Sequence, residues 1–208
     1  LMCLIGLGFS MSRGGWISAL CGGLLFIAML FPYIRTRGRF IPLAVLGLIL
    51  LLGFTTFHMI GVAPIAERVK HTMDDTYLGM AGRAMIWEST FNAVKEKPGG
   101  YGPGMYRYEY QRFRPKGFFK RVHFAHNDYL HISFEAGIIG LALICALIYK
   151  AYGYIFNGYY YFLGTIQKED YSDRFSESRC TARLGLLMGA AAALTAMVIH
   201  SLVDFSLH

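Results

Sequence analysis

Charged residues are scarce in this chain of 208 residues: 16% are Asp, Glu, Lys or Arg, against about a quarter in an ordinary soluble domain. Hydrophobic residues make up 55%, and the mean hydropathy is +0.40. The apolar excess is concentrated in uncharged runs at 14–34, 40–66 and 184–203. Each run is close to the ~20 residues that cross a bilayer as a helix. The sequence therefore predicts an all-α protein, a polytopic bundle of transmembrane helices.

Cysteines are few and show no paired spacing, and three of the four lie in apolar stretches: Cys3, Cys21, Cys145 and Cys180. This argues against a disulfide framework and against a zinc site of the common spacing. The start of the chain also lacks the basic segment and the small-residue cleavage site of a signal peptide. Residues 1–12 are uncharged and lack an initiator methionine, so we expect a truncated span and a chain that is part of a larger membrane protein.

The orientation follows from a short basic connection that holds Arg35, Arg37 and Arg39. Short basic loops stay cytoplasmic. Alternation then places the turn at 11–15 and the long segment from about 67 to 131 outside. All seven histidines fall on or near this outer side, which is a hint that the chemistry is external.

We predict three regions from this pattern. Residues 1–66 form transmembrane helices, the first truncated, with a basic cytoplasmic loop near 35–39. Residues 67–131 form an external loop that carries the site and contains short amphipathic helices. Residues 132–208 form transmembrane helices again, with a cytoplasmic loop near 163–183, and 132–156 is the weaker fourth candidate span because Glu135 and Lys150 lie near its ends.

Within the external loop, residues 84–97 place Trp87, Phe91 and Val94 at helical spacing, and the run ends at Pro98-Gly99-Gly100. This predicts a short amphipathic helix that lies on the membrane or on the span bundle. The stretch "PGGYGPG" at 98–104 is a glycine-rich turn that lets a ligand approach the backbone.

Two arginines are candidate anion ligands. Arg13 lies in a tight turn between two spans, and Arg83 lies near the N-terminus of the predicted amphipathic helix. A guanidinium at membrane depth or beside a helix N-terminus is suited to phosphate. The plainer interpretations are an interfacial arginine that reaches lipid headgroups and a solvated first-turn residue.

The stretch "YRYEYQRFRPKGFFKR" at 106–121 interleaves basic and aromatic side chains, including Arg112 and Arg114. In a soluble protein this would indicate a single-stranded nucleic acid platform. Outside a membrane, nucleic acid is not the expected partner, and aromatic faces for sugars with cations for phosphates fit better. The alternative is a basic interfacial patch without a specific ligand.

The stretch "HFAHNDYLH" at 123–131 gathers three histidines beside an apolar run. A zinc site is one interpretation, although the spacing matches no strong zinc pattern. The other is general base chemistry, since a neutral imidazole with a pKa near 6.5 accepts a proton from a hydroxyl. Asn127 and Asp128 either orient that base or cap the helix that begins near Tyr129. Glu135, His200 and Asp204 add ionisable groups at the same depth, and helix-end solvation is the plainer interpretation for Asp204.

In order along the chain, "SRGGW", "GRAMIW", "KPGGYGPGMY", "HFAHNDYLHISFEAGIIG" and "HSLVDFSLH" resemble motifs of the bacterial O-antigen ligase/polymerase family. The resemblance covers nearly the whole chain, and the chain is similar to the C-terminal half of the proteins of that family. It implies a multi-pass protein of the bacterial inner membrane whose large loop and active site face the periplasm.

The resemblance also implies an activity: transfer of a glycan from undecaprenyl pyrophosphate to an acceptor hydroxyl, with no metal, cofactor or nucleotide sugar. The acceptor is the lipid A core in ligases, a second lipid-linked glycan in polymerases, and a protein side chain in a related branch. By motif position, His126 matches the histidine proposed to activate the acceptor, and Arg13 and Arg83 match the arginines thought to hold the pyrophosphate. We assign substrate binding to a further set: Tyr101, Arg112, Arg114, His123 and Asn127. Two other interpretations stay open: a lipid-linked glycan transporter, and a metal-dependent membrane hydrolase built on His123, His126 and Asp128.

Overall fold

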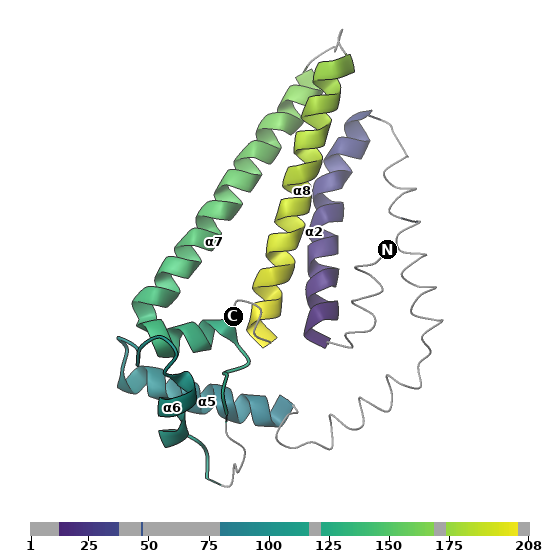
Figure 1. Ribbon diagram of the computed structural model, residues 1–208. Helices are drawn as coiled ribbons and strands as arrows, with labels where there is room; N and C mark the ends of the chain where they lie inside the picture. The colour runs from purple at the N-terminus through teal and green to yellow at the C-terminus, as the bar shows by residue number, and fades with distance from the viewer. Residues whose placement is uncertain (1–12, 38–46, 48–79, 117–121, 169–173, 204–208) are drawn as a thin grey trace, which may run out of the picture. The chain divides into compact units, whose positions relative to one another are not determined.

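The computed structural model describes residues 13–37, 47, 80–116, 122–168 and 174–203. Within these ranges the chain forms helices joined by turns, and no strand occurs among them, so the predicted all-α class is confirmed. The elements, shown in Figure 1, are α2 (Arg13–Arg37), α5 (Met80–Glu96), α6 (Tyr106–Glu109), the 3-10 helix η1 (Tyr110–Arg112), α7 (Asp128–Lys168) and α8 (Arg174–Val203).

Three of these helices are long and apolar enough to cross a membrane: Gly14–Arg35 in α2, Asp128–Lys168 (α7) and Ser178–Leu202 in α8. The predicted spans at 14–34 and 184–203 are therefore confirmed as span-capable helices. The predicted span at 40–66 lies outside the described residues. The chain is an integral membrane protein, and the side of the membrane on which each end lies stays a prediction.

The fourth candidate span is longer than predicted and is interrupted. Helix α7 extends over 41 residues, and its backbone leaves the helical conformation at Gly137 (φ 72°, ψ −175°). A short helix over 128–136 is thus followed, after the break, by a long one that ends at Lys168. The predicted connection at 163–183 is helical over 163–168 and 174–183, so the helices reach further into it than the apolar runs indicated.

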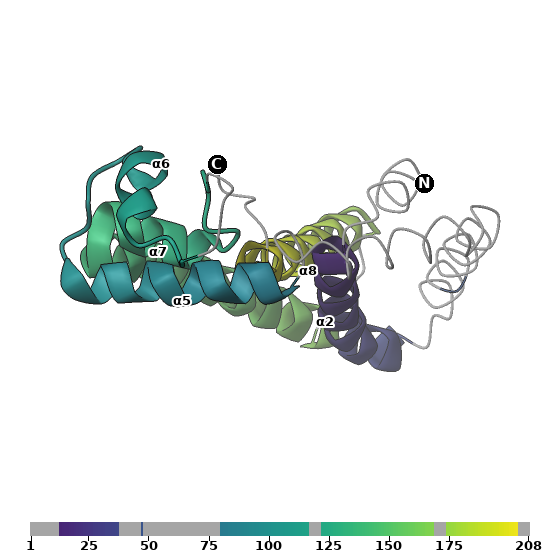
Figure 2. The same cartoon turned by 90° about the horizontal axis from the view of Figure 1, so that it is seen from below.

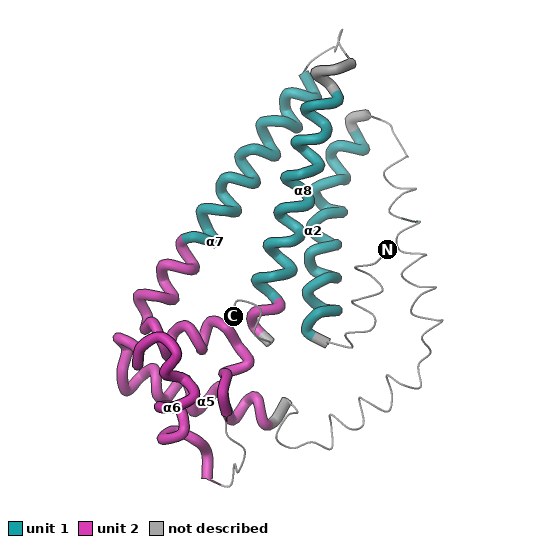
Figure 3. The backbone as a smooth tube through the Cα atoms, in the orientation of Figure 1, with its two compact units in different colours: residues 1–59, 147–199 teal, residues 60–146, 200–208 magenta. Residues whose placement is uncertain are grey.

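Residue contacts divide the chain into two compact units, which Figure 3 distinguishes by colour. Unit 1 comprises residues 1–59 and 147–199, and unit 2 comprises residues 60–146 and 200–208. In unit 1, α2 lies beside α8 and the second half of α7 (Figure 1).

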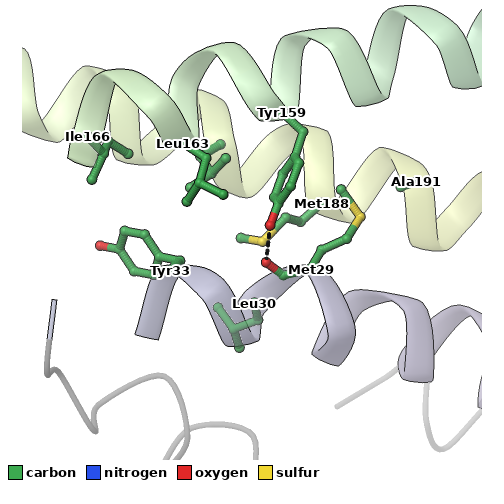
Figure 4. Packing of buried hydrophobic residues seen from close by; sticks show 9 residues of the cluster. Met29, Leu30, Tyr33, Tyr159, Leu163, Ile166, Met188 and Ala191 are labelled. Carbon is green, nitrogen blue, oxygen red and sulfur yellow. Dashed lines mark hydrogen bonds between the residues drawn. The ribbon is translucent and has the colours of Figure 1, made fainter. Parts of the chain in front are cut away.

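The core of unit 1 is built from all three of its long helices. Figure 4 shows that α2 contributes Met29, Leu30 and Tyr33, and that the side chains of α7 and α8 pack against them. The Tyr159 hydroxyl donates to the Met29 carbonyl at 2.7 Å. A buried tyrosine needs such a partner, because an unpaired hydroxyl in an apolar environment costs about 1–3 kcal/mol.

Unit 2 has its own core, in which α5 lies alongside α6 and the start of α7 (Figure 2). Tyrosine and phenylalanine rings dominate this core, and Tyr106, Tyr110 and Phe134 are essentially inaccessible. Most of the residues predicted to form the site belong to this unit.

Candidate functional site

The inward face of α5 differs from the predicted one. The prediction placed Trp87, Phe91 and Val94 on one apolar face, but Phe91 is 50% exposed, and the buried positions include Ser89 and Thr90. Ser89 and Thr90 are buried because two tyrosines from the following segment form hydrogen bonds with their hydroxyl groups. Helix α5 itself is confirmed, although it begins earlier and ends at Glu96.

The two tyrosine contacts have the same form. Thr90 Oγ1 lies 2.7 Å from the Tyr106 hydroxyl and donates its own proton to the Ile86 carbonyl at 2.7 Å. Tyr106 must therefore donate to Thr90, because a threonine hydroxyl has one proton. Ser89 and Tyr110 repeat the arrangement, with 2.7 Å between their oxygens. Burial raises the pKa of Tyr106 well above its usual value and raises the pKa of Tyr110, so both stay protonated.

The glycine-rich turn is bound to the break in α7 by exchanged backbone hydrogen bonds. In a continuous helix the Ile138 amide would donate to the Phe134 carbonyl. Here Ile138 N–H donates to the Pro98 carbonyl at 2.9 Å, and the Phe134 carbonyl accepts from Tyr101 N–H at 2.8 Å. The Glu135 carbonyl accepts from Gly102 N–H at 3.0 Å. The turn predicted to receive a ligand is thus occupied, at this edge, by α7 itself.

Glu135 also holds the start of α6. Its Oε1 accepts from the Tyr106 backbone N–H at 3.1 Å and lies 3.4 Å from His131 Nε2. The buried imidazole of His131 stacks on the Tyr106 ring, with centroids 4.5 Å apart. Glu135 and His131 therefore form part of the unit 2 core in the described structure.

The backbone just before His126 is held from two directions. Trp87 Nε1 donates to the Ala125 carbonyl at 2.9 Å, across 38 positions of sequence. On the other side, the Ala125 amide donates to His131 Nδ1 at 3.5 Å, the long end of the hydrogen-bond range. Ala125 itself is completely buried. The peptide unit that leads into His126 is thus fixed to α5, and the preceding peptide unit is fixed to α7.

His126 follows in a left-handed backbone conformation, with φ 53°, the single positive φ among the described residues other than glycine. Such a backbone costs a side-chain-bearing residue about 1–2 kcal/mol. Residues of this kind persist where the surroundings determine the backbone, and they cluster at functional sites. No local sequence pattern predicted this conformation.

Asn127 caps α7, one of the two roles that the sequence left open. Its Oδ1 accepts from Leu130 N–H at 3.1 Å, the usual bond from an N-cap side chain to the third helical residue. Its Nδ2 donates to the Leu202 carbonyl near the end of α8, at 2.9 Å. Both ends of the Asn127 amide are thus used within unit 2. Asp128, completely buried, is the first residue of α7.

Arg83 lies in the first turn of α5 and is half-buried. It precedes Trp87 by four residues, and positions i and i+4 share one face of a helix. Because Trp87 binds the carbonyl of Ala125, this face of α5 is the one beside His126. Arg13, in contrast, is the first residue of α2 and belongs to unit 1.

Tyr101 and Arg112 line a shallow polar pocket of about 340 Å³ together with Glu96, Lys97 and Glu109. Arg112 donates to Glu109 at 3.0 Å, and this hydrogen bond raises the pKa of the exposed guanidinium. The Tyr101 ring stacks on Phe134 with centroids 4.4 Å apart. One face of the tyrosine is therefore covered by the core rather than open to a sugar.

The remaining predicted residues, His123 and Arg114, are exposed in the segments beside this core. Among the residues that the structure describes, no group of three His, Cys, Asp or Glu side chains lies close enough together to hold a metal ion. Trp87 was predicted only as an apolar position, and its hydrogen bond to Ala125 was missed. The one available signal was its place in "GRAMIW", four residues after Arg83.

The fold and these segments define a polytopic, all-helical membrane protein whose second compact unit has a core of buried aromatic rings. The model of the family described as O-antigen ligase matches residues 1–145, which is more than half of the chain, so the chain belongs to the O-antigen ligase family. No curated protein and no solved structure matches it at a significant level. Membership implies an enzyme that transfers glycosyl groups in glycan ligation or polymerisation, with lipid-linked glycans as substrates.

Proposed function

We propose that this enzyme transfers a glycan from undecaprenyl pyrophosphate to an acceptor hydroxyl at the periplasmic face of the bacterial inner membrane. The acceptor we favour is the lipid A core, as in a ligase. His126 serves as the general base, and Arg13 and Arg83 hold the pyrophosphate. No metal ion takes part in the proposed reaction.

The observation that carries the proposal is the left-handed backbone of His126 at the entry to α7. The neighbouring residues Ala125 and Asn127 are both bound to other elements, and His126 between them has the one positive φ found outside glycine among the described residues. A general base must be fixed relative to its substrate, and preorganised geometry of this kind meets that need.

In the proposed step, the acceptor oxygen forms a bond to the anomeric carbon while the bond from that carbon to the pyrophosphate oxygen breaks. The acceptor proton passes to His126, and the leaving pyrophosphate takes the electron pair. Arginine guanidinium groups stabilise the developing negative charge, because they are always protonated and bind phosphate oxygens in a forked geometry. Direct displacement inverts the anomeric centre.

The experiment uses the protein in isolated bacterial membranes and follows transfer of a polyprenyl-pyrophosphate-linked glycan. Wild type, His126→Ala and Arg83→Gln are compared at equal protein level, each with and without EDTA. We expect His126→Ala to lose at least about a hundredfold in rate, the usual contribution of a general base. We expect EDTA to leave wild-type transfer unchanged. Normal transfer by His126→Ala would instead favour a glycan transporter or binding subunit, and loss of transfer in EDTA would favour the metal-dependent alternative.

The acceptor is tested in the same membranes. A ligase joins the glycan to the lipid A core, whereas a repeat-unit polymerase lengthens the lipid-linked glycan, and a protein O-oligosaccharyltransferase modifies a protein side chain. Separation of the labelled products into lipid A-linked, polyprenyl-linked and protein-linked fractions distinguishes the three.

A further inference from the structure

Two side chains outside the predicted catalytic set hold the two peptide units on either side of Ala125. The Trp87 indole and the His131 imidazole come from α5 and α7, and they bind the carbonyl and the amide of Ala125. Ala125 is completely buried and directly precedes His126. Packing alone does not require the polar atom of either side chain, since an apolar side chain at the same position would also bury apolar surface.

We propose that Trp87 and His131 are positioning residues for His126: by fixing the two peptide units that flank Ala125, they maintain the left-handed backbone that presents the base to the acceptor. This inference rests on the proposed function, because it needs His126 to be the base. Trp87 and His131 thereby join the residues on which catalysis depends, and Trp87 acts through its hydrogen bond to the backbone carbonyl of Ala125.

The geometry supports this role for Trp87 in particular. Its hydrogen bond to the Ala125 carbonyl is short, at 2.9 Å, and joins residues 38 positions apart. The same face of α5 carries Arg83, one turn earlier. A single helix therefore positions both the proposed base and one of the proposed pyrophosphate ligands, so that a shift of α5 would move the two together.

His131 supplies the second contact through a specific tautomer. Its Nδ1 accepts from Ala125 N–H, so the ring proton lies on Nε2, which is 3.4 Å from Glu135 Oε1. Tyr106 stacks on the ring, and its own amide donates to the same Glu135 oxygen. The orientation of His131 is thus set by α6 and α7 together.

The main test compares Trp87→Phe with Tyr110→Phe in isolated membranes. Each change removes one hydrogen-bond donor from unit 2, but only Trp87 is bonded to Ala125. We expect Trp87→Phe to lower kcat at least tenfold while the KM for the lipid-linked donor stays within twofold. We expect the kcat of Tyr110→Phe to stay within threefold of the wild-type value. Size-exclusion chromatography in detergent measures the amount of folded protein for both variants.

The result that overturns the inference is equal loss in both variants, or wild-type transfer by Trp87→Phe. A parallel His126→Ala sample separates the two proposals. If that variant transfers normally, the proposed function fails, whereas if it is inactive and Trp87→Phe is fully active, only the positioning role fails.

A second pair of variants covers the case in which Trp87→Phe does not fold. In His131→Asn the amide oxygen takes the place of Nδ1 and still accepts from Ala125, whereas in His131→Gln the amide lies nearer to Nε2 and Glu135. We expect His131→Asn to retain at least five times more transfer per folded molecule than His131→Gln. Equal activity, or the reverse order, would overturn the role of His131.

Discussion

The backbones at Gly100 and Gly137 are in contact, so that neither glycine has room for a side chain. A Cβ atom on Gly100 would lie 2.6 Å from the Gly137 amide nitrogen, and one on Gly137 would lie 2.6 Å from the Pro98 carbonyl oxygen. Both have a positive φ, and at Gly137 the pair φ 72°, ψ −175° is accessible essentially to glycine alone. This contact joins the glycine-rich turn to the break in α7.

The first prediction concerns this contact. Gly100→Ala adds a Cβ against backbone atoms and keeps a positive φ of 84°, so we expect it to destabilise the protein by at least about 2 kcal/mol. Gly99→Ala is the matched control, because a Cβ there meets nothing within 4 Å. Thermal unfolding in detergent should show a lower midpoint for Gly100→Ala alone. Equal midpoints for the two variants would contradict the contact.

The second prediction concerns the buried hydroxyl pair of Thr90 and Tyr106. Thr90→Val leaves the Tyr106 hydroxyl without its 2.7 Å partner and should cost about 1–3 kcal/mol. The double variant Thr90→Val/Tyr106→Phe removes both polar groups, so we expect it to cost less than the sum of the two single changes. A double-mutant cycle of unfolding midpoints measures the difference. Strict additivity would show that the two hydroxyls are not coupled.

The sequence predicted the elements that depend on composition and missed those that depend on a distant partner. Apolar runs located the span-capable helices at 14–34 and 184–203 because length and hydropathy are local properties. The break at Gly137 was not predicted, since a glycine within an apolar run also occurs in an uninterrupted helix. Its conformation depends on the turn at 98–102, which supplies the replacement hydrogen bonds.

The candidate site shows the same division. Motif order located the segment around His126 and the helix that carries Arg83. The prediction of the buried face of α5 was wrong because it used the spacing of apolar residues alone. Ser89 and Thr90 are polar, and they are buried because tyrosine hydroxyls form hydrogen bonds with them. Likewise, no local pattern indicates that the Trp87 indole binds a carbonyl 38 positions away.

The third prediction concerns alkaline pH. Burial raises the pKa of Tyr106 and Tyr110 above their unfolded value of about 10. Below that pH both states keep the proton and stability is unaffected. Above it the unfolded tyrosines lose a proton that the folded ones retain, so stability falls with rising pH until the pH passes the folded pKa of each tyrosine, with a slope of at most about 1.4 kcal/mol per pH unit for each.

The measurement is the unfolding midpoint in detergent between about pH 8 and pH 11. Tyr110→Phe removes one of the two groups and should make the decline above pH 10 shallower, even though its midpoint at neutral pH is lower. An unchanged slope in this variant would mean that Tyr110 does not contribute to the alkaline loss.

The fourth prediction concerns the packing of α2 against α8 in unit 1. A Cβ on Gly22 would lie 2.6 Å from the Ala192 carbonyl oxygen and 3.2 Å from the Ala196 side chain, whereas one on Gly23 would meet nothing within 4 Å. Small residues of this kind let membrane helices approach closely. Gly22→Ala should cost about 1–3 kcal/mol, and Gly23→Ala should be neutral or slightly stabilising. Paired thermal unfolding curves check this, and a destabilised Gly23→Ala would contradict it.

The fifth prediction concerns Arg112, which is predicted to bind substrate. Its guanidinium is exposed and paired with Glu109, three residues earlier, so its removal should leave the unfolding midpoint unchanged. If the side chain binds donor phosphate or sugar, Arg112→Gln raises the KM for the donor several-fold and leaves kcat unchanged. Lys95→Gln, which removes a cation from the exposed side of α5, is the matched control and should change neither value. Initial rates over a range of donor concentrations in membranes give both constants. An equal rise in KM for the two variants would indicate a general effect of positive charge on an anionic lipid, and no rise in either would remove Arg112 from the substrate-binding set.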